Sequence, residues 1–217
     1  MKKSVYSLVL MDDVVEAIDE MAYRLGTSRS NLINQILAEK VSYITPEQRM
    51  RNIFECIRSM MDSHFLIQGQ SSDAMLSIRS PLRFKYKPTI RYRVELLREK
   101  KADTFGCLTV SFRTQSAQLM QALEAFFRIW SVIENKYSGN RFSGGVEYSF
   151  SDGKFVRSLK LIEGFDYDND RLGEAVGNLI SLVDQGIKTY FANIDIPELA
   201  LKNIESLYKG NADNVIV

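Results

Sequence analysis

The sequence predicts an α+β chain with two domains, one over residues 1–45 and one over residues 46–217. Three observations lead to this prediction. Residues 3–10 alternate with the period of a strand and are followed by two short helical patterns. Thr45 and Pro46 then interrupt the pattern. Beyond them, strand-like and helix-like segments follow one another in two similar series, which is typical of a sheet covered by helices.

The opening strand is predicted to have two different faces, because successive side chains of a strand point to opposite sides. Large apolar side chains dominate one face, and smaller or polar ones the other. The first face carries Tyr6, Leu8 and Leu10, and the second carries Lys3, Val5, Ser7 and Val9.

Two short amphipathic helices are predicted to follow the strand. Asp12 and Asp13 favour a helix start, because carboxylates are stabilised by the exposed amides and the helix dipole there. Gly26 favours the end of this first helix, and Ser28 is placed to cap the second. The predicted apolar stripes are Val14, Ile18, Ala22 and Leu25 in the first helix, and Leu32, Ile33, Ile36, Leu37 and Val41 in the second.

One strand and two short helices cannot enclose a core by themselves. Both sides of the strand lack a partner, and each helical stripe needs a surface to pack against. A two-fold dimer solves both problems, because the strand pairs with its copy and the four helices interlock. The resulting two-stranded antiparallel ribbon has the right size to enter the major groove of DNA.

Residues 2–43 resemble the ribbon-helix-helix (Arc/MetJ/CopG-type) DNA-binding family. The order of strand, helix, turn and helix matches without a gap, and the turn of Gly26, Thr27, Ser28, Arg29 and Ser30 is its most specific part. The resemblance implies a homodimer that binds double-stranded DNA. It also implies that the start of the second helix holds a DNA phosphate, through Ser28 and the backbone N–H groups of Arg29, Ser30 and Asn31.

The resemblance places base contacts on the outward strand face, at Lys3, Val5, Ser7 and Val9. Here the sequence departs from the family, which usually has Arg, Lys, Gln, Asn or Thr at these positions. Ser7 can form a hydrogen bond with a base edge, and the two valines can pack on thymine methyl groups. Sequence preference is therefore expected to rest on few strong contacts.

The larger domain is predicted to contain two strand-strand-helix units, with helices on one face of the sheet. Its first helix follows Thr45, which stands in capping-box spacing with Gln48. Asp170 is expected to cap the helix of the second unit. The predicted strands are 82–97, 105–113, 143–150 and 155–162, and the predicted helices are 116–137, 170–191 and a short one from Pro197.

Positive charge is concentrated in one segment, although the formal net charge is only +1. Residues 79–101 contain nine basic side chains against two acidic ones. Two interpretations remain open: a solvated sheet face, or a second polyanion surface for DNA phosphates or an anionic effector. Aromatic residues alternate onto the opposite face, which argues against stacking of single-stranded bases. The basic face comprises Arg83, Lys85, Lys87, Arg91 and Arg93.

The residues that enzymes and metalloproteins need are not found in this sequence. There is no glycine-rich phosphate loop and no Cys-x-x-Cys pair, and His64 is the only histidine. Asp166, Asp168 and Asp170 resemble the start of a calcium loop, but Arg171 and Gly177 occupy the positions where such a loop needs Gly and Glu. We therefore expect no catalytic site, no metal and no cofactor. Cys56 and Cys107 are expected to be buried thiols.

These observations predict a homodimeric, sequence-preferring DNA-binding protein, most simply a transcriptional repressor. Two alternatives remain: a protein-interaction or inhibitor module that uses residues 1–45 only to dimerise, and an accessory DNA-binding factor of a plasmid or mobile element. In the DNA-binding protein, residues 46–217 would mediate higher oligomerisation or bind a small-molecule or protein effector. No apolar run is long enough to span a membrane, so we expect a cytoplasmic protein.

Overall fold

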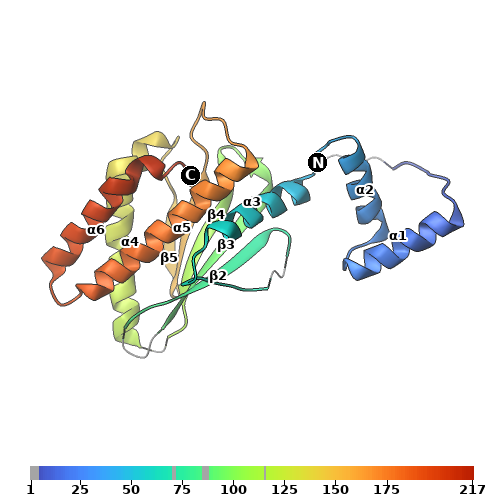
Figure 1. The fold of residues 1–217 in the computed structure, drawn as a ribbon. Coiled ribbons are helices and arrows are strands. Elements are labelled where there is room, and N and C mark those ends of the chain that lie inside the picture. The colour runs from blue at the N-terminus through green and yellow to red at the C-terminus, as the bar shows by residue number, and fades with distance from the viewer. Residues whose placement is uncertain (1–4, 70–71, 85–87, 115) are drawn as a thin grey trace. The chain divides into compact units, whose positions relative to one another are not determined.

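A computed structural model describes residues 5–69, 72–84, 88–114 and 116–217 of the chain (Figure 1). It confirms the predicted α+β class, with six α-helices and a six-stranded antiparallel sheet in the described part. The chain forms two compact units, Met1–Arg49 and Met50–Val217, which we call the first and the second unit. Each unit is described separately below.

The first unit contains helices α1 (Asp12–Arg24) and α2 (Arg29–Lys40). Residues 5–10 are extended but belong to no strand, whereas the sequence predicts a strand over residues 3–10. The physical reason is that a strand is defined by its hydrogen-bonded neighbour, and one copy of the chain offers none here. Lys3, at the start of that predicted strand, lies outside the described residues.

The turn between α1 and α2 is tightly hydrogen-bonded. The N–H of Thr27 donates to the carbonyl oxygen of Ala22 (3.0 Å), and the N–H of Gly26 donates to that of Tyr23 (3.1 Å). Gly26 adopts the left-handed conformation, with φ of 60°. This pair of hydrogen bonds requires that conformation at the residue after the helix cap. The predicted helix end at Gly26 therefore has its physical basis in a Schellman motif.

The second unit is built on one sheet with the strand order β1-β2-β3-β4-β6-β5, in which all neighbours are antiparallel. Helix α3 (Pro46–Met60) precedes the sheet and is capped by Thr45, whose Oγ1 accepts from the N–H of Gln48 at 3.1 Å. The strands are β1 (Leu66–Ile67), β2 (Met75–Pro81), β3 (Thr89–Lys101), β4 (Thr104–Phe112), β5 (Tyr148–Ser151) and β6 (Lys154–Lys160). The other helices are α4 (Ala117–Ser138), α5 (Asn169–Ala192) and α6 (Pro197–Asn211), with short 3-10 turns at Gly139–Arg141 and Ala212–Asn214.

Two successive strand-strand-helix series are present, β3-β4-α4 and β5-β6-α5. Several predicted boundaries were wrong. The strand predicted over residues 82–97 begins only at Thr89, because residues 82–84 and 88 belong to the connection from β2. The strand predicted over 143–150 is confined to Tyr148–Ser151, and α5 is capped by Asp168 rather than Asp170. Strands β1 and β2 were not predicted.

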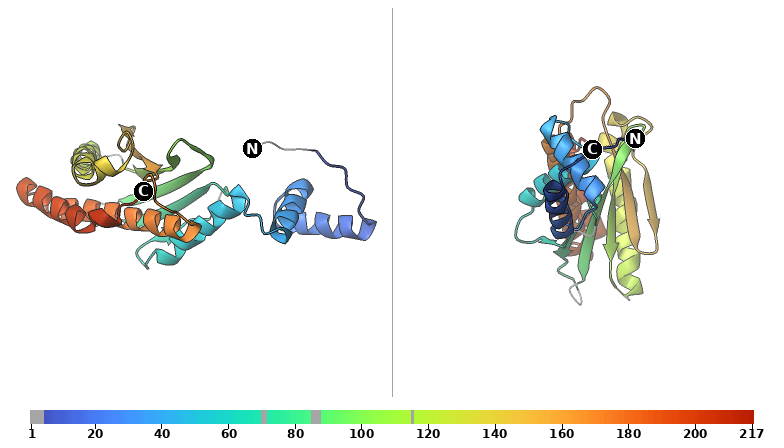
Figure 2. Two further views of the ribbon diagram at one scale, coloured as in Figure 1. Left: turned by 90° about the horizontal axis from the view of Figure 1, so that it is seen from above. Right: turned by 90° about the vertical axis from the view of Figure 1, so that its right-hand side faces the viewer.

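One face of the sheet is buried beneath the helices. Along β3, the side chains of Ile90, Tyr92, Val94 and Leu96 are buried, and those between them are partly or fully exposed. Helices α5 and α6 run along this side of the sheet, as Figure 1 and the left view of Figure 2 show. The core of the second unit is thus a sheet-helix layer, and the opposite sheet face is left uncovered by helices.

The helices approach one another closely at two glycines of α5. A Cβ atom on Gly173 would lie 2.4 Å from Cβ of Cys56 on α3, and one on Gly186 would lie 2.4 Å from Cζ3 of Trp130 on α4. Replacing either glycine with a residue that has a Cβ atom would force the packed helices apart. These glycines therefore serve helix packing.

A buried ionic network crosses the core of the second unit. Nε and Nη2 of Arg157 on β6 donate to Oε1 of Glu134 on α4 at 3.1 and 2.8 Å, and both side chains are fully buried. The hydroxyls of Tyr148 and Tyr208 donate to the same carboxylate at 3.0 and 3.3 Å. Burial disfavours the charged guanidinium, but the Glu134 carboxylate outweighs this and raises the pKa of Arg157. The network is fully paired, as buried charges must be.

Candidate nucleic-acid interface

The start of α2 presents backbone N–H groups to the surface. Ser28 caps the helix in an extended conformation, and its Oγ accepts from the N–H of Asn31 at 3.3 Å. The N–H groups of Arg29 and Ser30 have no acceptor among the described residues, and both residues are exposed. Two of the three predicted phosphate-binding amides are thus available to an anion, while the third already serves the cap.

The side chain of Arg29 does not point freely toward a ligand. Its Nε and Nη2 donate to both carboxylate oxygens of Asp19 on α1. Hydrogen bonding to Asp19, and then the charge of that carboxylate, raise the pKa of Arg29. Arg29 therefore ties α2 to α1, and any phosphate contact at this position is expected from its backbone N–H.

The side chain of Asn31 is also engaged within the turn. Its Nδ2 donates to Oγ1 of Thr27 at 2.8 Å. Together with the Ser28 cap, this bond fixes the backbone of residues 27–31. A rigid turn presents its N–H groups in a fixed direction, which lowers the entropic cost of binding an anion.

The predicted base-contacting residues lie on the extended segment of residues 5–10. Val5 and Val9 are fully exposed, and Ser7 is exposed between them. Tyr6, Leu8 and Leu10, which alternate with them, are exposed as well. Neither predicted face of the strand is covered in a single chain, including the face expected to pack inward.

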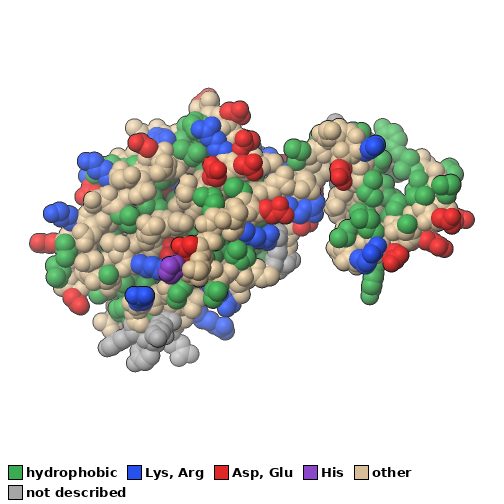
Figure 3. All heavy atoms as spheres, in the orientation of Figure 1, with side chains coloured by type: hydrophobic (Ala, Val, Ile, Leu, Met, Phe, Trp, Pro, Cys, Tyr) green, Lys and Arg blue, Asp and Glu red, His purple; other side chains and the backbone are tan. Residues whose placement is uncertain are grey.

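The first unit exposes far more apolar surface than its size warrants. Of the twenty large apolar side chains that are exposed in the described chain, fourteen lie within residues 5–44. Figure 3 shows hydrophobic side chains open to the surface over α1, α2 and the segment before them. Only Ala22, Leu32 and Ala38 are buried in its two helices. A patch of this extent marks a contact surface, because monomeric proteins seldom leave one uncovered.

The predicted helical stripes are only partly covered. Leu32 is buried, and Val14, Ile18 and Ile33 are half-buried. Leu25, Ile36, Leu37 and Val41 remain exposed. The covered residues are those at the contact between α1 and α2.

The predicted second polyanion surface needs correction. Arg91 and Arg93 lie on β3 and on the uncovered face of the sheet, but Arg83 lies in the connection before that strand. Lys85 and Lys87 lie outside the described residues. Sequence reading missed Arg79 on β2, Arg113 just after β4, and Lys154 on β6, which lie with Arg91 around one groove. The alternation of residues 76–80 is the sequence signal that indicates an outward Arg79.

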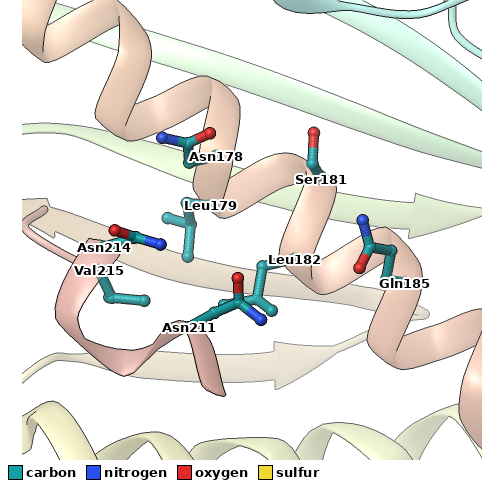
Figure 4. Close-up of a pocket in the computed structure, with 8 residues that line it drawn as sticks. All are labelled: Asn178, Leu179, Ser181, Leu182, Gln185, Asn211, Asn214 and Val215. Atoms are coloured by element: carbon teal, nitrogen blue, oxygen red, sulfur yellow. The ribbon is translucent and has the colours of Figure 1, made fainter. Parts of the chain in front are cut away.

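Other candidate sites offer less chemistry. Figure 4 shows a cavity of about 120 Å³ between α5 and the segment after α6, where Asn178, Gln185 and Asn214 supply neutral amides. It has room for a few water molecules.

His64 and Asp168 have structural partners. His64 is exposed and paired with Asp62. Asp168 caps α5 by accepting from the N–H of Arg171 at 2.7 Å.

The cysteines are partly buried rather than fully buried as predicted. Burial is the main cause that raises the pKa of each thiol, Cys56 and Cys107. Among the residues that the structure describes, no three His, Cys, Asp or Glu side chains gather where they could hold a metal ion. Within the same part of the chain, no helix combines the length and the apolar character needed to cross a bilayer.

The sequence and the fold were compared with known proteins. No protein-family model, no curated protein and no solved structure matches the chain.

Proposed function

We propose that this protein is a homodimer that binds double-stranded DNA through its first unit and acts as a transcriptional repressor. In this proposal, residues 5–10 of two copies pair as an antiparallel ribbon that enters the major groove. Val5, Ser7 and Val9 then face the base edges, and the start of α2 in each copy holds a phosphate. The single observation that carries the proposal is the uncovered apolar surface of the first unit, next to an unpaired extended segment.

The uncovered surface supports dimerisation of this unit. Leu25, Ile36 and Leu37 are exposed on its two helices, and full burial of one such side chain contributes about 1.5–3 kcal/mol. A second copy covers them symmetrically and also supplies the missing neighbour of residues 5–10. Dimerisation would therefore cover the exposed apolar side chains and pair residues 5–10 at the same time.

The turn before α2 supports a contact with the DNA backbone. The free N–H groups of Arg29 and Ser30 stand at the positive end of the α2 dipole, which attracts phosphate. The side chains that stabilise the turn, Ser28, Asn31 and Thr27, bond within it and leave these donors open. Such a contact positions a protein on DNA without reading its sequence.

The test is duplex binding by the full chain, measured by fluorescence anisotropy over a range of salt concentrations. The logarithm of the association constant should fall linearly with that of the salt concentration, by about 0.9 for each phosphate contact. Dimer that shows no affinity for genomic duplex fragments at low salt would contradict the proposal. The first unit would then be the dimerisation element of a protein-interaction or inhibitor module.

Substitutions at Ser30 test the phosphate contact. Ser30→Glu should weaken binding to every duplex, because its carboxylate would repel the phosphate held at the start of α2. A carboxylate in the first turn favours the helix, so the variant should remain folded. Ser30→Ala is the matched control, because it keeps the backbone donor and should bind like the parent protein. Equal binding by both variants would exclude this contact.

A substitution at Ser7 separates base reading from backbone contact. Ser7→Ala removes a hydroxyl that can contact a base edge but leaves the backbone donors intact. We expect it to change the preference between duplex sequences and to leave the salt dependence unchanged. Selection from a random duplex pool by the two proteins provides the measurement.

A further inference from the structure

A row of cations crosses the uncovered face of the sheet in the second unit. Arg79 on β2 is the register partner of Arg91 on β3, which is in turn the partner of Ser111 on β4. Ser111 is the partner of Lys154 on β6. Because neighbouring strands lie about 4.8 Å apart, the row extends over roughly 14 Å. Its residues alternate with Ile78, Tyr92 and Val110, which are buried under the helices, so the row faces away from them.

No described carboxylate neutralises these cations. In the described part, Arg79, Arg91, Arg113 and Lys154 form no ion pair with any carboxylate. Arg93, the next outward residue along β3, differs because Glu95 lies 3.7 Å from its Nη1. Like charges directly opposite each other on neighbouring strands are destabilising. The pairing of Arg79 with Arg91 is therefore an unfavourable arrangement that a bound anion would relieve.

The row lines a groove at one end of the sheet, with a volume of about 580 Å³. Arg113 and the β5-β6 turn, at Asp152 and Gly153, also line the groove. Asp152 is the only carboxylate among the lining residues, all of which are described, and it pairs with none of the cations. The aromatic ring in the lining belongs to Phe112, which packs against Phe127 in the core, 6.2 Å between ring centroids. Among the described residues that line the groove, no aromatic side chain is thus free to stack on a base.

We infer that this groove binds phosphate groups of the double-stranded DNA backbone and forms a second contact surface of the protein. The inference rests on the proposed function for the identity of the ligand, and it adds a site in the other unit. Arg79 and Arg91 would contact one phosphate together, and Lys154 would contact another. A row of roughly 14 Å exceeds the width of either groove of B-DNA, about 12 Å and 6 Å, so its ends can reach phosphates on both strands.

Duplex DNA fits this surface better than a small anionic metabolite does. Small-molecule sites are usually enclosed and lined mostly by apolar side chains, which bury most of the ligand. The groove is open along the sheet, and its side chains are mainly cationic or hydroxylic. The absence of a free aromatic ring also disfavours single-stranded nucleic acid, which is held by stacking.

The test compares the salt dependence of duplex binding by the full chain and by Arg79→Ala/Arg91→Ala. Because the two arginines are proposed to contact one phosphate together, the slope should become less steep by about 0.9 in each chain. Arg79→Lys/Arg91→Lys keeps both charges and should largely retain the slope. Lys202→Ala/Lys209→Ala is the matched control, because it removes the same charge from exposed positions on α6 and should leave the slope unchanged.

The outcomes separate this inference from the proposed function. If Ser30→Glu weakens binding and the groove variants change nothing, the inference is wrong and the first-unit interface stands. If the groove variants change the slope and Ser30→Glu does not weaken binding, the groove binds DNA and the first-unit interface is wrong. A wild-type protein without duplex affinity at low salt would overturn both. Fluorescence of Trp130, the only tryptophan, verifies that the second unit of each variant is folded.

Discussion

The two units of this chain differ in how much of their apolar surface each buries within one chain. The second unit closes a continuous core between one sheet face and its helices, and its buried charges are paired. The first unit buries only three side chains in its helices and leaves most of its large apolar residues exposed. Stability of the second unit is thus a property of one chain, whereas that of the first is expected to depend on protein concentration.

The largest expected effect concerns assembly. Leu37 is 53% exposed, so Leu37→Glu breaks no substantial contact within one chain, but it places a charge where two copies should meet. Loss of two buried leucines should weaken the dimer by about 3–6 kcal/mol, which sedimentation velocity would detect as monomer. Val132→Glu is the matched control, because Val132 is similarly exposed on α4 of the second unit. Equal sedimentation of both variants would place the dimer contact elsewhere.

A second prediction probes the self-sufficiency of the second unit. Glu134→Ala leaves the Arg157 guanidinium buried without its carboxylate, and this should lower the free energy of unfolding by about 3–5 kcal/mol. Denaturant unfolding followed by Trp130 fluorescence measures it. Glu124→Ala, which breaks an exposed ion pair with Arg128 on the same helix, should have little effect. A loss that changed with protein concentration would indicate that the second unit also relies on a partner.

The smallest expected effect appears at high pH. Burial is the main cause that raises the pKa values of Tyr92, Tyr148 and Tyr208 above their ordinary value near 10. The folded state keeps these protons above pH 10, while the unfolded state releases them. Stability is therefore unaffected near pH 7 and falls as pH rises beyond 10, by about 1.4 kcal/mol per pH unit for each tyrosine.

Tyr148→Phe isolates the contribution of one tyrosine. It leaves the bonds between Arg157 and Glu134 in place and should reduce the alkaline slope by about 1.4 kcal/mol per pH unit. Urea midpoints at several pH values between 9 and 11 would show this. An unchanged slope would mean that Tyr148 ionises as readily in the folded state as in the unfolded one.

Local signals in the sequence located most helices of both units. Gly26, Ser28, Thr45 and the apolar stripes act within a few residues, and the structure places helix ends at or near them. The alternation of residues 82–88 continues that of β3 and predicts a strand start that is too early, because residues 82–84 and 88 belong to the connection from β2. The pairing of β4 with β6 joins distant segments, and no local pattern encodes it.

The candidate sites were predictable to different degrees. The turn at residues 26–31 is continuous in sequence, so its residues could be named before the fold was known. The groove of the second unit gathers residues from β2, β3, β6 and the chain after β4. Only Arg91 of its four cations was predicted. Arg79 and Lys154 join it through strand register, which becomes visible only once the sheet is assembled.

The short edge strands of the sheet limit backbone pairing with another chain. β1 has two residues and β5 has four, so each border of the sheet offers few free backbone groups to another chain. Proteins commonly shorten border strands in this way to avoid aggregation. Residues 5–10 form a longer segment than β1 or β5, and their backbone pairs with no described strand. In the proposed homodimer these residues pair with their copy in the second chain, and growth into fibrils through the sheet is disfavoured.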